Sequence, residues 1–163
     1  MRTRSLLVLV ATAVAITAVV PIAAAEKDEE RLVVTERMQL TSFNPVTGEG
    51  TQAGTFVAAG ALNDAGTAVA TFRVTPGKNG CGVLTGPHTL TGSIGTITVL
   101  TKAVICPFPP TNPPRSFASG TWRVIGSGGS YTGLHGRGTI VATADFTTGE
   151  ITIARDGEVE RDE

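Results

Sequence analysis

Residues 121–146 read TWRVIGSGGSYTGLHGRGTIVATADF. One alternating apolar run enters this stretch through Trp122 and Val124, and a second leaves it through Ile140 and Ala142. Between the two runs lies a dense group of glycines, which permits positive φ angles and sharp bends of the chain. The stretch therefore predicts two antiparallel strands that meet at a glycine-rich corner of a barrel.

The same period of two recurs along the rest of the chain, with turn residues between short runs. We expect strands near 31–42, 54–62, 67–75, 88–94, 95–105, 117–126, 136–146 and 150–155. Inward positions such as Ala68 and Ala70 are small, which suits either a tightly filled barrel or a space for a ligand. The predicted fold class is all-β, a closed antiparallel eight-stranded β-barrel that is packed for most of its length, with room for a cavity at one mouth.

The glycine segment is similar to one in the allene oxide cyclase/dirigent-like β-barrel superfamily, a group of calycin-like folds. There, a glycine–aromatic–glycine segment followed by G-x-G links two late strands of an eight-stranded barrel. The matching residues are Gly126, Gly128, Tyr131, Gly133, Leu134, Gly136 and Gly138. The resemblance covers residues 54–154 and implies relatives that cyclise oxylipins or polyketides, steer radical coupling, or are exported bacterial proteins of unknown activity. It places no catalytic set on this sequence. We expect Tyr131 and Leu134 to plug one end of the barrel.

The first 25 residues have the layout of a secretory signal peptide: basic Arg2 and Arg4, an uncharged run, and small residues at 23–25. We expect cleavage between Ala25 and Glu26 and therefore a secreted, extracellular protein; an uncleaved membrane anchor is the alternative. The predicted organisation is a signal peptide (1–25), an acidic N-terminal tail (26–30), a β-barrel domain (31–155) and an acidic C-terminal tail (156–163).

Charge and cysteine content limit the kinds of partner and the compartment that we expect for this protein. The chain has 13 basic and 14 acidic residues without a concentrated basic stripe, so we expect no nucleic-acid binding, and no segment after the leader suits a membrane span. In an exported chain, Cys81 and Cys106 predict one disulfide bond. This bond would join a glycine-rich turn to the proline-rich segment 107–115, which we interpret as a stiff surface loop.

Few residues suit catalysis. Only two histidines occur, and we interpret His88, after Gly86-Pro87, and His135, within the glycine segment, as turn or strand-end residues. Neither has partners at the spacing of a zinc site, and no nucleophile elbow surrounds Ser130. We therefore expect no metal and no cofactor.

Glu36 is the sharpest polar anomaly, because a regular strand places it on an apolar face. The residues that share this face are Leu32, Val34, Met38 and Leu40. A desolvated carboxylate has a raised pKa and can act as a general acid or base, or orient a ligand. The alternative is a bulge or a position at the barrel rim, where the carboxylate reaches water or pairs with an arginine.

Scarce acid–base groups and small inward side chains favour a non-catalytic extracellular module that binds a small apolar or amphipathic molecule, or a surface partner. One alternative, from the resemblance, is a cyclase or isomerase that acts on a lipid- or polyketide-like substrate in the barrel mouth. Weak candidates for its polar contacts are Glu36, Tyr131 and His135. A second alternative is an inhibitor or envelope-interaction protein that uses the 107–115 loop. The ligand and the oligomeric state stay open.

Overall fold

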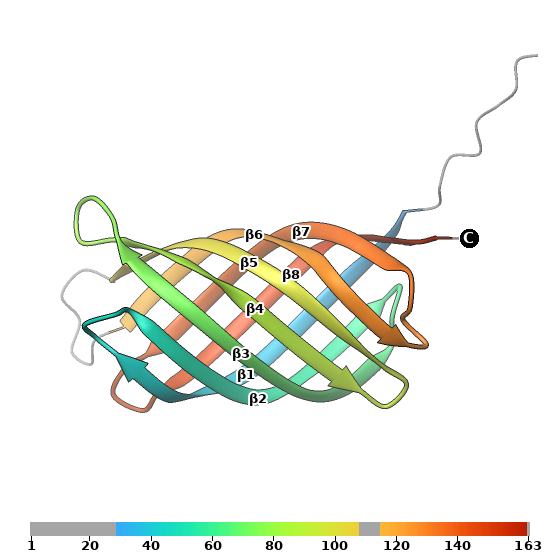
Figure 1. The fold of residues 1–163 in the computed structure, drawn as a ribbon, viewed down its shortest axis with the longest axis horizontal. Coiled ribbons are helices and arrows are strands. Elements are labelled where there is room, and N and C mark those ends of the chain that lie inside the picture. Colours follow the sequence, from blue (N-terminus) through green and yellow to red (C-terminus); the bar gives the residue numbers. More distant parts are fainter. Residues whose placement is uncertain (1–28, 108–114, 163) are drawn as a thin grey trace, which may run out of the picture.

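The computed structural model describes residues 29–107 and 115–162, which form one closed, up-and-down antiparallel barrel (Figure 1). The strands are β1 (Glu30–Asn44), β2 (Glu49–Gly60), β3 (Asp64–Pro76), β4 (Gly82–Gly92), β5 (Gly95–Pro107), β6 (Arg115–Gly129), β7 (Leu134–Asp145) and β8 (Glu150–Arg161). Each strand pairs with the next in the chain, and β8 pairs with β1, which closes the sheet. The predicted all-β class and eight-stranded closed barrel are confirmed. The expected signal peptide and most of the proline-rich segment lie outside the described residues.

β4 differs most from the prediction, since it begins at Gly82 rather than near residue 88. Gly86 and Pro87 appear in the sequence as chain breakers, yet the strand runs through them. The pairing of β3 with β4 passes from Ala70↔His88 to Arg73↔Thr85 and omits this dipeptide. A proline has no N–H to donate to a neighbouring strand, so a local break in the ladder lets β4 continue.

Residues that were predicted to belong to the acidic tails are also part of the sheet. β8 continues to Arg161, so most of the segment predicted as a C-terminal tail is strand, paired with both β1 and β7. Asp156 and Glu158 are exposed, whereas Val159 is buried. Because the outward positions of this part of β8 are acidic, its alternation of buried and exposed residues is hard to recognise in the sequence. At the other end, β1 already starts at Glu30.

The glycine segment supplies a bulge and a turn, in that order. Between β5 and β6 the register passes from Thr98↔Gly126 to Val99↔Val124, which leaves Ile125 as the extra residue of a bulge. The turn to β7 follows, with positive φ angles of 65° at Gly129 and 78° at Gly133. The other glycines of the predicted turn lie within the flanking strands: Gly126 and Gly128 in β6, and Gly136 and Gly138 in β7.

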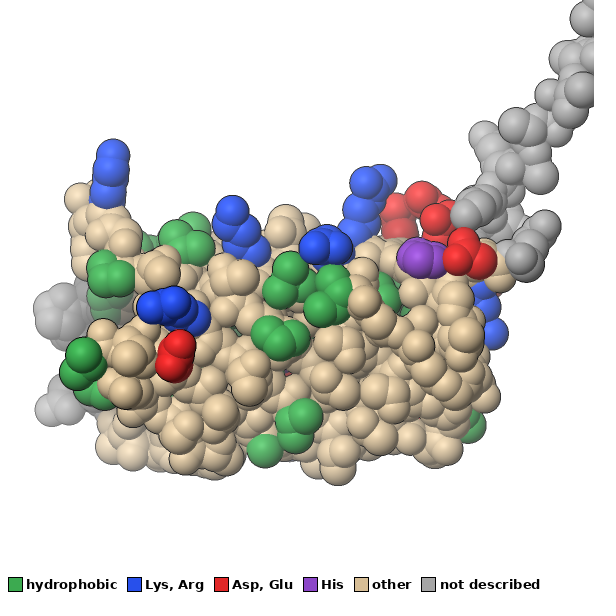
Figure 2. Space-filling model, viewed as in Figure 1, with side chains coloured by type: hydrophobic (Ala, Val, Ile, Leu, Met, Phe, Trp, Pro, Cys, Tyr) green, Lys and Arg blue, Asp and Glu red, His purple; other side chains and the backbone are tan. Residues whose placement is uncertain are grey.

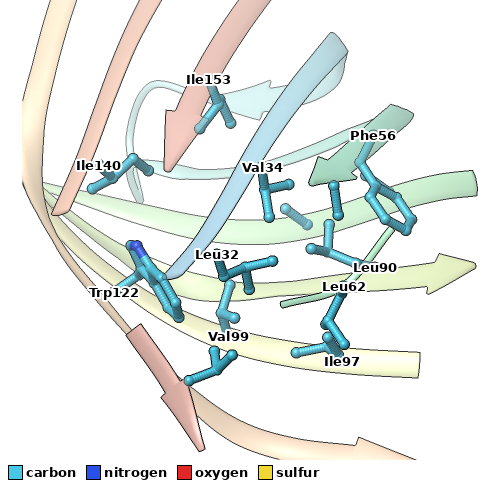
Figure 3. Packing of buried hydrophobic residues seen from close by; sticks show 14 of the residues in the cluster. Leu32, Val34, Phe56, Leu62, Leu90, Ile97, Val99, Trp122, Ile140 and Ile153 are labelled. Atoms are coloured by element: carbon cyan, nitrogen blue, oxygen red, sulfur yellow. The ribbon is translucent and has the colours of Figure 1, made fainter. Parts of the chain in front are cut away.

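A hydrophobic core cluster occupies the interior of the barrel (Figure 3), and most of its large side chains lie in the half where β1 begins and β8 ends, while Ile140 and Ile153 extend it toward the other half. An eight-stranded barrel has an interior just wide enough for side chains to fill it. The labelled members of this cluster include Leu32, Val34, Phe56, Leu62, Leu90, Ile97, Val99 and Trp122. Tyr131 and Leu134, which the sequence predicts as an end plug, are buried in the same cluster.

Trp122 fits into this core because a glycine, Gly157, lies beside it. A Cβ atom on Gly157 would lie 2.7 Å from Cζ2 of Trp122 and 2.7 Å from Cα of Gly138. Both distances are far below van der Waals contact, and the Gly138 atom belongs to the backbone. The largest side chain of the core therefore occupies space that the absence of a Cβ atom at Gly157 leaves free.

The outside of the barrel is mostly polar. Figure 2 shows one long face on which charged side chains gather toward the upper edge and hydrophobic side chains form small groups. Exposed cations of neighbouring strands include Lys102, Arg123 and Arg137. No helix that is long and apolar enough to cross a bilayer occurs among the described residues.

The predicted disulfide bond lies at the opposite end from the packed core. The sulfur atoms of Cys81 and Cys106 are 2.07 Å apart, which is bonding distance. Cys81 precedes β4, and the adjacent pair Gly82↔Ile105 belongs to the β4–β5 ladder. The bond therefore fastens the ends of two neighbouring strands that already pair.

Replacing Cys81 and Cys106 together by alanine should lower the free energy of unfolding by roughly 3 kcal/mol, the value that chain entropy gives for a loop of this length. The barrel should persist, because the ladder between β4 and β5 does not require the bond. Urea unfolding followed by circular dichroism measures both effects. Loss of the β-sheet signal without denaturant would contradict the expectation, and reduced wild-type protein is the control.

Candidate functional site

Glu36 lies on the inner face of β1 and is fully buried, with 0% of its surface exposed. Its inward orientation agrees with the two-residue period of the sequence, and the alternative of a rim position in contact with water is wrong. One carboxylate oxygen, Oε1, accepts a hydrogen bond from Nε of Arg155 at 2.5 Å. The other, Oε2, accepts one from Nδ1 of His88 at 3.2 Å. Each of the two carboxylate oxygens thus accepts one hydrogen bond.

Arg155 extends this network to the far side of the barrel. Its Nη1 donates to Oγ1 of Thr101 at 2.9 Å, and 1% of the residue is exposed. Arg155 is on β8 and Thr101 on β5, while Glu36 is on β1 and His88 on β4. The bond from Arg155 to Thr101 joins β8 to β5, and the bond from His88 to Glu36 joins β4 to β1, so each crosses the lumen between strands that are three apart around the barrel. We call these four residues the cross-barrel network.

The charges of the network follow from its geometry. Burial raises the pKa of Glu36, but the charge of Arg155 and the contact with His88 lower it more, so it lies below the usual 4.5. The expectation of a raised pKa is therefore wrong, whereas the pairing with an arginine that the alternative predicted is present, inside the barrel rather than at its rim. Burial is the largest influence on His88 and lowers its pKa; the hydrogen bond to Glu36 raises the pKa, the charge of Arg155 lowers it again, and the net pKa lies below the usual 6.5. At neutral pH the network holds a carboxylate, a guanidinium and a neutral imidazole.

A cavity of about 170 Å³ lies next to the network, toward the disulfide end of the barrel. His88 and Thr101 belong both to the network and to the cavity lining. The other lining side chains are mostly apolar and include Leu40, Phe43, Phe72, Ile105, Ala118 and Ile140. The cavity therefore has apolar walls and a polar floor.

Two further buried polar side chains line the cavity. Gln52 and Ser116 are only 6% and 3% exposed, and neither makes a side-chain hydrogen bond within the described part of the chain. Buried amides and hydroxyls normally find a partner. Both groups are thus available to a molecule inside the cavity.

The three candidate residues from the sequence occupy separate environments. Glu36 belongs to the cross-barrel network. Tyr131 donates to Asp64 at 2.5 Å in the packed end, where burial and then this hydrogen bond raise its pKa to about 12. His135 lies in β7 with an exposed side chain, and its Nε2 is 2.7 Å from Oδ2 of Asp162. The structure does not bring the three together. Within the described ranges, no group of three metal-ligating side chains occurs.

One alternative from the sequence gave Glu36 an arginine partner, but the sequence identified neither Arg155 nor His88 as the partners that Glu36 has. The interpretation of His88 as a turn or strand-end residue is wrong, because it lies inside β4 with an inward side chain. The period of two holds a signal for it, since His88 shares its face with Leu90. Arg155 likewise shares its face with Ile153, but it stands at the start of the acidic segment that was expected to leave the barrel.

Comparison of the chain with models of protein families, with curated proteins and with solved structures finds no match. The resemblance of the glycine segment to allene oxide cyclase-like proteins therefore stays a prediction. Function has to be argued from the cavity and the network.

Replacing Glu36 by glutamine should lower the free energy of unfolding by about 3–5 kcal/mol, because the guanidinium of Arg155 would stay buried without a counter-charge. The matched control is Asp156→Asn, which breaks the exposed pair between Asp156 and Arg31 and should change stability by less than about 1 kcal/mol. Urea unfolding of both variants gives the comparison. Equal effects would mean that the buried pair has no special weight.

Stability should fall on acidification below about pH 6.5, before most carboxylates titrate. The unfolded chain gains a proton on this histidine near pH 6.5, whereas folded His88 has a lowered pKa and stays neutral. The loss is then up to about 1.4 kcal/mol per pH unit. Glu36 contributes a further loss below pH 4.5, since its pKa is also lowered.

Unfolding measured between pH 8 and pH 5 tests this expectation. A His88→Gln variant, which keeps a donor for Glu36, should lose the dependence above pH 5. His135→Gln is the control and should keep it, because that side chain is exposed. A pH profile unchanged in His88→Gln would contradict the assignment.

Proposed function

We propose that the barrel binds one small amphipathic molecule in the cavity at its disulfide end. The observation that carries this proposal is the combination of a volume of about 170 Å³ with apolar walls and a polar floor. An engineered apolar cavity of about 150 Å³ is known to take up benzene. The cavity therefore suits a ligand of about the size of a substituted six-membered ring.

The distribution of groups suggests how such a molecule would lie. Phe43 and Phe72, whose rings stack with centroids 6.3 Å apart, belong to the lining, and Phe43 is partly exposed. His88 and Thr101 lie at the floor, next to the buried charges. The apolar part of the ligand would contact the aromatic side, and its polar group would face the floor. Sites of this kind use a few placed polar groups for orientation.

Binding is better supported than catalysis by Glu36. Its carboxylate is held ionised by Arg155, accepts two hydrogen bonds and is not part of the cavity lining. Tyr131 and His135 lie in other parts of the barrel. A disulfide between Cys81 and Cys106 also supports our proposal that the protein acts outside the cytoplasm, because such bonds persist in oxidising compartments.

Small ring compounds such as toluene, phenol and cyclohexanol should bind, and Ala118→Leu should weaken binding at least tenfold by filling the cavity. Titration followed by methyl signals of Ile140 and Ile153, which line the cavity, measures affinity and location together. The control is Ser119→Leu, an outward neighbour on the same strand, which should leave binding unchanged. The proposal fails if none of these compounds shifts the lining methyl signals of the wild-type barrel.

A further inference from the structure

We infer that the cavity selects a neutral hydroxyl compound, a phenol or a ring alcohol, whose O–H donates to Nε2 of His88 and whose oxygen accepts the O–H of Thr101. This inference rests on the proposed function and adds the chemical class of the ligand. It follows from how the cross-barrel network uses up some hydrogen-bonding groups and leaves others.

The tautomer of His88 is fixed by its partner. A carboxylate can only accept hydrogen bonds, so Nδ1 of His88, 3.2 Å from Oε2 of Glu36, must carry a hydrogen. In a neutral imidazole the other nitrogen, Nε2, is then an acceptor. Nε2 has no hydrogen-bond partner among the described residues, and the residue lines the cavity. The floor thus offers an acceptor, which an ether or a hydrocarbon cannot use.

Thr101 supplies the complementary group. Its Oγ1 accepts a hydrogen bond from Nη1 of Arg155, and no further side-chain bond of this hydroxyl occurs in the described ranges. Its own hydrogen is therefore available to a ligand in the cavity that it lines. His88 pairs with Val99 on β5, so Thr101 lies two residues further along the facing strand, on the same side. Such diagonal positions are close enough for one bound oxygen to contact both side chains.

Charge excludes the ionised alternatives. The carboxylate of Glu36 and the guanidinium of Arg155 already compensate each other in charge, and both are almost fully buried. Nη2 of Arg155 is a donor without a partner in the described residues, but Arg155 does not belong to the cavity lining. A carboxylate or ammonium ligand would place an unpaired charge beside this pair in an apolar space, which is strongly unfavourable. A neutral hydroxyl group satisfies the floor without this penalty. Gln52 and Ser116 can add contacts for a second polar substituent.

The test compares phenol, anisole and toluene, which share one ring and differ in the donor. Phenol should bind about tenfold more tightly than anisole or toluene, as expected for one well-placed hydrogen bond. If toluene and anisole bind as tightly as phenol, the cavity binds ligands but this inference is overturned. If none of the three binds, the proposed function itself fails.

Imidazole ¹⁵N signals provide a readout that a purely steric effect would not move. In the free protein His88 should show the Nδ1–H tautomer, and its Nε2 signal should shift with phenol but not with toluene. His135, exposed and far from the cavity lining, is the internal control. Thr101→Ser should keep the preference for phenol and Thr101→Val should lose it. An Nε2 signal that does not respond to bound phenol would overturn the inference even if Thr101→Val does not fold.

Discussion

The ion pair between Glu36 and Arg155, closed inside the barrel, is the constraint that the rest of the interior obeys. A buried pair often stabilises a fold no more than apolar side chains of the same size, yet removing one member leaves a costly charge. In this barrel the pair selects one register of strand pairing. A slip of one residue in β1 or β8 would turn Glu36 or Arg155 to the outer face and separate it from its partner. The pair therefore favours one closure of β8 on β1.

The network also divides the interior into two unlike halves. Toward the chain termini, large apolar side chains such as Trp122 and Phe56 fill the lumen (Figure 3). Toward the disulfide, inward positions of β5 and β6 carry the small side chains of Ala103 and Ala118, and the cavity lies among them. The small inward residues predicted a barrel that is packed for most of its length, with room for a cavity at one mouth. The structure has a packed end and a cavity at the other end.

Period and composition were sufficient to predict the barrel, the end plug and the cysteine pair, because each depends on local pattern or on simple pairing. The inward orientation of Glu36 was one of two interpretations that the period of two allowed. The partners of Glu36 were not predictable in this way. Arg155 lies 119 residues away and His88 52 residues away, so they meet only when eight strands close. Local signals were also misleading, since Pro87 suggests a chain break and the acidic residues after Arg155 suggest a tail.

The cavity is hard to explain by stability alone. A space of about 170 Å³ deprives the lining side chains of packing contacts that a filled interior would give them. Larger side chains at Ala103 or Ala118 would restore part of these contacts. Gln52 and Ser116 add polar groups to the lining, and Nη2 of Arg155, in the adjacent network, is a buried donor without a partner in the described residues. Breaks in local rules of this kind are expected where a protein binds a molecule, and here several of them converge on one space. The convergence, rather than any single residue, is what supports the proposed ligand binding.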